Sequence, residues 1–265
     1  MERQNSGDEK MMLSILFALV ILAGVLISQR LGVYLGHRNK LATSEEGLAG
    51  VGSLEGATFG LMGLLVAFTF TGAATRFNDR RDLITQQVNA IGTAWLRLDL
   101  LKEPERKTVQ EGFRRYVDLE LEIVRDGGDE EKVRAGMNRL SVVQQEIWTN
   151  LVQAVRNDTS LPLAQVVLPP VNDMFDLSTS RLMAAQQHPP LPVFLMLGLL
   201  VLLSSLFAGF DMARAGTKSP LHVYGFAIIM ALSIYLILDI EYPRLGFITI
   251  ESFDRAMIDL RATMG

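Results

Sequence analysis

The sequence predicts an all-α polytopic membrane protein, with four transmembrane helices and a helical soluble insert between the second and the third. Apolar residues make up 49% of the chain and gather in four long blocks without Asp, Glu, Lys or Arg. Each block is about as long as a helix that crosses a hydrocarbon core of roughly 30 Å. The charged residues, 20% of the chain, lie mostly between the second and third blocks, where apolar residues recur with a helical period.

The first predicted hairpin occupies 11–75, after a polar N-terminal tail at 1–10 that we expect to lack regular structure. Its first span, 11–29, is longer than the apolar core of a signal peptide, roughly 7–15 residues, and no A-x-A-like cleavage site follows it. We therefore expect an uncleaved membrane helix. A mixed-charge connector at 30–55, with a glycine-rich run at 47–52 as a flexible entry, leads to the second span at 56–75.

The second span is predicted to continue well beyond the bilayer. The stretch 56–97 turns polar at Arg76, yet it contains no proline, and Gly92 is the only glycine of its polar half. Proline is the residue that most strongly ends or kinks a helix. One long helix that passes from lipid into water is the expected structure, and the rest of the chain is expected to be arranged around it.

Small residues recur along the membrane half of this helix at spacings of four or three. On a helix of about 3.6 residues per turn they form one narrow stripe. Such stripes let another helix backbone approach closely, which favours association inside a membrane. The stripe consists of Gly56, Gly60, Gly63, Ala67, Thr71 and Ala74.

The polar insert, 76–188, is predicted to be helical. Pro104 followed by Glu105 is typical of a helix start, and Asp129 is a candidate N-cap of the next helix. A further helical region contains Pro169-Pro170 and continues towards residue 187.

The second hairpin is predicted at 189–238, with spans at 191–210 and 220–238. The tail, 239–265, is expected to end in an amphipathic helix. Its apolar residues include Phe253, Met257, Ile258 and Leu260.

Four spans place both termini and the insert on one side of the membrane. Lys and Arg near the ends of the spans favour the cytoplasmic side. The insert side has more of them: Arg3, Lys10, Arg76, Arg80, Arg81, Arg181, Arg244 and Arg255, against Arg30, Arg38, Lys40, Arg214 and Lys218. The prediction is an integral protein of the plasma (inner) membrane, with the N-terminus, insert and C-terminus in the cytoplasm.

No catalytic, metal or cofactor site is predicted. The chain has no cysteine, its three histidines are not spaced as metal ligands, and no nucleophile stands in a recognisable catalytic motif. A net charge of -4 without a basic patch argues against a nucleic-acid partner. The expected role is therefore not enzymatic.

Two groups of charged residues have alternative interpretations. Asp239 and Glu241 follow the last span, and ionisable residues at a membrane boundary mark ion paths or are paired with an opposite charge. The pairing alternative has Arg76 or Arg244 as the partner. In the insert, 173–181 holds Asp173, Asp176 and Arg181, for which we expect salt bridges along one helix.

Four segments resemble the bestrophin-like membrane protein family. The first reads AFTFTGAATRFNDRRDLITQQVNAIGTAWLRLDLL, and the others are PERKTVQEGFRRYVDL, VNDMFDLSTSRLMAAQQHPP and LDIEYPRLGFITI. The resemblance covers nearly all of the chain from Gly56 onward. One departure is Gln87, at a position where the family pattern leads us to expect Glu before V-N-A-I-G.

The family is in turn distantly similar to the bestrophins, which are pentameric, mostly anion-conducting channels with four membrane helices per subunit. Their second helix lines the pore, and large apolar residues narrow the pore at a neck. Carried over residue by residue, the resemblance implies that Phe68 is a neck aromatic and that Leu64 is the apolar position one turn above it. Gly60 does not fit a neck, which implies a shorter or wider one. The calcium clasp of animal bestrophins has no counterpart here.

The resemblance thus implies a homo-oligomeric ion channel, with a pentamer as the model assembly and small inorganic ions, chloride among them, as the cargo. Leu64 and Phe68 would gate by dewetting. The alternative is a non-conducting membrane scaffold or sensor. Its helical insert would bind a cytoplasmic partner, and its small-residue stripe would pack inside one subunit.

Charged residues at the pore mouth would set the selectivity of such a channel. Arg76, Arg80 and Arg81 would favour anions at the cytoplasmic end. Asp239 or Glu241, if turned to the pore, would favour cations.

Overall fold

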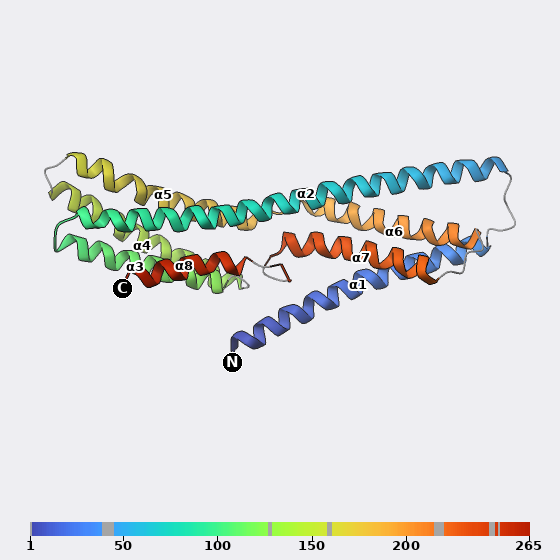
Figure 1. Cartoon of the computed structure of the whole chain (residues 1–265), viewed down its shortest axis with the longest axis horizontal. Helices are drawn as coiled ribbons and strands as arrows, with labels where there is room; N and C mark the ends of the chain where they lie inside the picture. The colour runs from blue at the N-terminus through green and yellow to red at the C-terminus, as the bar shows by residue number, and fades with distance from the viewer. Residues whose placement is uncertain are drawn as a thin grey trace. The chain divides into compact units, whose positions relative to one another are not determined.

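A computed structural model gives the structure of the chain and describes residues 2–38, 45–126, 129–157, 161–214, 220–243, 247–248 and 250–265. In these residues the regular elements are helical, as predicted. In chain order they are α1 (Glu2–Arg38), α2 (Glu45–Arg97), the 3-10 turn η1 (Leu98–Leu100), α3 (Glu105–Arg125), α4 (Glu130–Asn157), α5 (Leu161–Gln186), α6 (Leu191–Arg214), α7 (Pro220–Glu241) and α8 (Glu251–Thr263) (Figure 1).

Four helical stretches are long and apolar enough to cross a membrane, as predicted. They are Ile15–Arg38, Gly52–Leu100, Pro162–Arg214 and Val223–Glu241. The 53 residues of α2 form one unbroken helix (Figure 1), about 80 Å long at 1.5 Å per residue. The prediction of one long continuous helix is confirmed, and its length far exceeds a hydrocarbon core of roughly 30 Å.

The first two helices begin and end differently from the prediction. α1 already starts at Glu2 and continues to Arg38, and α2 starts at Glu45. The predicted tail at 1–10 and the glycine-rich run at 47–52 are thus helical in the described residues, and of the connector only 39–44 lies outside them. No proline occurs before Pro104, and each residue added to an existing helix gains a hydrogen bond; the apolar blocks therefore extend into their polar flanks.

The chain divides into two compact units. The first, which we call the membrane unit, comprises Met1–Phe77 and His188–Thr249; the second, the insert unit, comprises Asn78–Gln187 and Ile250–Gly265. α2 contributes its first part to the membrane unit and its last part to the insert unit. The C-terminal helix α8 belongs to the insert unit.

In the membrane unit α1 packs against α6 and α7. A Cβ atom on Gly32 would collide with the carbonyl oxygen of Leu206, and one on Gly209 with that of Gln29. Glycine is therefore required at both positions, because the backbones of α1 and α6 touch there, as small residues permit in membranes. The core of the unit includes Val25 and Leu197.

The insert unit has its own apolar core, formed by the end of α2 with α3, α4, α5 and α8. Phe113 and Ile147 are fully buried in it, and each such side chain contributes about 1.5–3 kcal/mol. α3 begins directly after Pro104, as predicted. Asp129 caps α4, also as predicted: its Oδ1 accepts the backbone N–H of Glu131 at 3.1 Å and that of Lys132 at 3.2 Å.

The predicted C-terminal helix is present as α8, and its position is a finding that the sequence did not provide. Met257 and Met264 are buried in the core of the insert unit. Arg261 donates a 2.8 Å hydrogen bond to Asp118 on α3. The tail is therefore a packed element of this unit.

Candidate functional site

The two gate candidates, Leu64 and Phe68, lie one turn apart on the same side of α2. Both side chains are exposed, Leu64 to 52% and Phe68 to 66%. The apolar surface that they form on α2 is therefore exposed.

The small-residue stripe lies beside these two side chains and is also open. Gly56, Gly60, Gly63, Ala67 and Thr71 are exposed, and Ala74 is half-buried. A Cβ atom on any of the first three glycines would meet no atom of the described chain within 4 Å. In the described residues, these three glycines therefore have room for a close neighbour.

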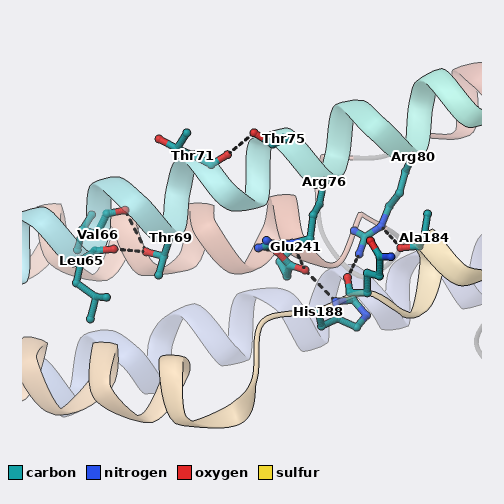
Figure 2. A network of polar contacts seen from close by, with 11 residues as sticks. Leu65, Val66, Thr69, Thr71, Thr75, Arg76, Arg80, Ala184, His188 and Glu241 are labelled. Atoms are coloured by element: carbon teal, nitrogen blue, oxygen red, sulfur yellow. Dashed lines mark hydrogen bonds and ion pairs between the residues drawn. The ribbon is translucent and has the colours of Figure 1, made fainter.

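The opposite side of α2 packs against the other helices of the membrane unit. Met62 and Ala73 are buried in the same core as Val25 of α1 and Leu197 of α6. Thr69 on this side satisfies its own hydroxyl by donating to the carbonyls of Leu65 at 2.7 Å and Val66 at 3.0 Å (Figure 2). In the membrane unit α2 thus has one packed face and one face that the described residues leave uncovered.

A buried charge cluster joins α2 to the end of α7. Glu241 is fully buried, and its carboxylate accepts hydrogen bonds from Arg76 Nη2 at 2.6 Å and from Arg76 Nε at 3.0 and 3.1 Å (Figure 2). His188 Nδ1 lies 2.9 Å from Glu241 Oε1. The His188 ring stacks on Tyr242, with 4.6 Å between ring centres.

Backbone N–H groups hold the Asp239 carboxylate. Its Oδ1 accepts the N–H of Phe247 at 2.9 Å, and its Oδ2 accepts the N–H of Ile248 at 3.1 Å. The side chain is buried, so Asp239 fixes the chain that follows α7. The sequence suggested Arg76 or Arg244 as the partner of Asp239 and Glu241. Arg76 pairs with Glu241, and Arg244 lies outside the described residues.

The other two arginines of the predicted pore mouth lie in the insert unit. Arg80 is buried and donates to the carbonyl of Ala184 from Nε at 3.1 Å and to that of Gln187 from Nη2 at 2.8 Å (Figure 2). These carbonyls lie at the C-terminal end of α5, where a positive charge is favourable. Arg81 is half-buried, and its Nη1 donates to Asn78 Oδ1 at 3.3 Å.

A buried polar network in the insert unit centres on Glu120, a residue that the sequence did not single out. Its Oε1 accepts hydrogen bonds from Gln87 Nε2 at 2.9 Å, Tyr116 Oη at 3.0 Å and Ser178 Oγ at 2.5 Å. Arg181 Nη1 lies 3.8 Å from Glu120 Oε2 and donates to Gln87 Oε1 at 2.9 Å. The network therefore connects α2, α3 and α5.

This network changes the interpretation of two features of the sequence. Arg181 extends to Gln87 and Glu120 rather than simply along α5, where Asp176 accepts a 2.8 Å hydrogen bond from Asn172. Gln87 itself is an amide, and the carboxylate that it contacts comes from Glu120 on α3. Burial, followed by the charge of Glu120, raises the pKa of the Tyr116 hydroxyl well above its usual value, so Tyr116 remains a donor.

These features define a helical integral membrane protein with a helical insert after its second span. A family model described as the bestrophin-like domain matches residues 51–252. The chain belongs to the bestrophin-like family. No curated protein and no solved structure gives a significant match to it.

Proposed function

We propose that this protein forms a homo-oligomeric channel for small inorganic ions, in which α2 of each subunit faces a central axis. The observation that carries the proposal is the two-sidedness of α2. Met62 and Ala73 attach one side to the membrane unit, while Leu64 and Phe68 on the other side are exposed. Contact with lipid would explain the exposed apolar side chains. It would not explain the three glycines on successive turns beside them.

The glycine positions supply the subunit contact in this proposal. Gly56, Gly60 and Gly63 are open to a neighbour, and helices associate closely in membranes through such residues. The α2 helices of adjacent subunits would then pack through the stripe and turn Leu64 and Phe68 towards the axis. A pentamer is the expected assembly because the bestrophins are pentamers.

Leu64 and Phe68 form the gate of the proposed channel. Rings of apolar side chains close a pore by excluding water, without any contact that blocks it sterically. The role is conduction and not an enzymatic reaction. The insert faces the cytoplasm of a plasma (inner) membrane, in keeping with the excess of Arg and Lys near the spans on that side.

Ion flux tests this function. The purified full chain is reconstituted into liposomes, and the flux of the wild type is compared with that of Phe68→Ala. The proposal expects flux in both, and more in the variant because its apolar ring is smaller. Phe17→Ala is the matched control, since Phe17 is an exposed phenylalanine on α1 and should leave the flux unchanged. Absence of ion flux in both the wild type and Phe68→Ala would contradict the proposal.

A further inference from the structure

Glu55, near the start of α2, is a buried carboxyl group in the membrane unit. Only 5% of the residue is exposed. Its Oε1 atom is buried, and no N–H or O–H group of the described residues donates a hydrogen bond to it. A buried carboxylate that lacks a donor is strongly unfavourable, so the group that compensates Glu55 has to be identified.

The carboxyl of Glu55 makes a hydrogen-bonding contact with the carboxyl of Asp211 on α6. In the part of the membrane unit that the structure describes, the charged groups that act on Glu55 are Asp211 and Arg214, both on α6. An ionised carboxylate has no hydrogen to donate, and two negative charges in contact repel each other. The contact between these two carboxyls therefore requires a positive ion between their oxygen atoms.

A proton fits this pair better than a metal ion does. Ca²⁺ takes about six to eight oxygen ligands and Mg²⁺ about six, whereas a proton is shared by two oxygens. The described residues contain no group of three or more Asp, Glu or His side chains that could hold a metal ion. Two carboxyls that share one proton are an established arrangement in proteins.

The surroundings of the two carboxyls decide which of them carries the proton. The Asp211 side chain is 50% exposed, and its Oδ1 lies 3.9 Å from Arg214 Nη1. Water and the guanidinium both stabilise a negative charge on Asp211. Glu55 has neither advantage to the same extent, and a neutral carboxyl is much less costly to bury than an ionised one.

We propose that Glu55 and Asp211 form a proton-binding site that joins the start of α2 to the end of α6. Neutral Glu55 donates its O–H to Asp211, which stays ionised beside Arg214. When the proton leaves Glu55 for water, two carboxylates face each other and the hydrogen bond between the helices is lost. The site is independent of the proposed channel, because the proton is held inside the membrane unit of one chain.

Infrared spectroscopy of the purified full chain in detergent tests the site directly. A protonated carboxyl absorbs at a higher carbonyl frequency than a carboxylate. At about pH 6, where ordinary Asp and Glu side chains are ionised, the wild type should show this band and Glu55→Gln should lack it. Asp173→Asn is the matched control, because Asp173 is exposed on α5 and its loss should leave the band unchanged.

Asp211→Asn changes the more exposed member of the pair and serves as a second variant. It removes the negative charge that opposes ionisation of Glu55. The infrared band should therefore disappear at a lower pH than in the wild type, whereas Asp173→Asn should not shift it.

Thermal unfolding in detergent gives a readout of the link between the helices. The amide of Glu55→Gln can donate to Asp211 at every pH. Between about pH 6 and pH 9, the range in which the proton is expected to leave, the melting temperature of the wild type should fall relative to that of Glu55→Gln. Asp173→Asn should follow the wild type.

The outcomes distinguish a proton from other occupants of the pair. An infrared band that is equal in the wild type and Glu55→Gln, or absent from both, overturns the site, and so does a melting-temperature difference that stays constant with pH. Replacing sodium by a bulky organic cation at equal ionic strength should change nothing. A stabilisation by sodium that Glu55→Gln lacks would assign the pair to a metal cation and overturn the proton.

Discussion

Glu241 Oε2 accepts a 2.6 Å hydrogen bond from Arg76 Nη2, across 165 residues of sequence. The two side chains differ in exposure: the Arg76 side chain is 26% exposed and the Glu241 side chain 1%. This asymmetry decides which partner is more costly to lose, because a charge left in the interior is far less favourable than one that reaches water.

We therefore expect Arg76→Met to lower the melting temperature more than Glu241→Gln does. Arg76→Met removes the guanidinium that donates to a fully buried carboxylate, and losing one member of a buried pair costs on the order of 3 kcal/mol. Glu241→Gln keeps a neutral acceptor for an arginine that is partly hydrated. Thermal unfolding of the purified variants in detergent measures the difference, and an equal or reversed order would show that Glu241 does not depend on Arg76.

Swapping the amide and the carboxylate between positions 87 and 120 is expected to preserve stability. Placing carboxylates at both positions is expected to lower it. Gln87→Glu places two carboxylates where Gln87 Nε2 now donates to Glu120 Oε1, and like charges at such distances repel. Adding Glu120→Gln restores one amide and one carboxylate, and Arg181 already reaches both positions. The double variant should recover most of the stability that Gln87→Glu loses.

A double-mutant cycle on chemical unfolding of the full chain measures this coupling. Additive effects of the two substitutions, with no recovery in the double variant, would mean that the two residues do not share a network.

The crossing of α1 and α6 is expected to require glycine. Gly32→Ala and Gly209→Ala each place a methyl group against a backbone carbonyl of the other helix, so the helices must separate and lose their packing contacts. Gly198→Ala on α6 is the control, because a Cβ atom there meets no atom within 4 Å. Size-exclusion profiles and melting temperatures should show loss for the first two and none for the third; equal behaviour of all three would refute the close crossing.

The stabilisation of α4 by Asp129 is expected to depend on pH. The backbone N–H of Lys132, followed by its side-chain ammonium and the N–H of Glu131, lowers the pKa of Asp129. The unfolded chain then binds a proton more readily than the folded one, so the stabilisation is present above the unfolded pKa of about 3.9 and is lost as pH falls through the lower folded value.

Asp129→Asn keeps a cap without the charge. Its melting temperature should fall below that of the wild type at pH 7, and the gap should close in acid. A gap that stays constant down to acid pH would exclude a charged cap.

The features that the sequence predicted are those that depend on residues close together in the chain. The length of α2 follows from the absence of proline, the start of α3 from Pro104, and the cap of α4 from Asp129. The stripe beside Leu64 was also readable, because helical spacing alone places its members together.

The features that it did not predict depend on contacts between distant segments. Glu120 looks like any acidic residue on an amphipathic helix, and nothing local shows that Gln87, Tyr116 and Ser178 surround it. Arg80 was assigned to a pore mouth by its position after the span, whereas its neighbours at the end of α5 turn it inward. The docking of Met257 on the insert unit likewise required the tertiary structure.

The most direct test of the proposed assembly is a single-particle reconstruction of the purified full chain. The account predicts rotational symmetry, with α2 of each subunit nearest the axis, the glycine stripe at the contact between neighbours, and Leu64 and Phe68 turned to the centre. A monomer, or an oligomer with α1, α6 or α7 at its axis, would contradict it.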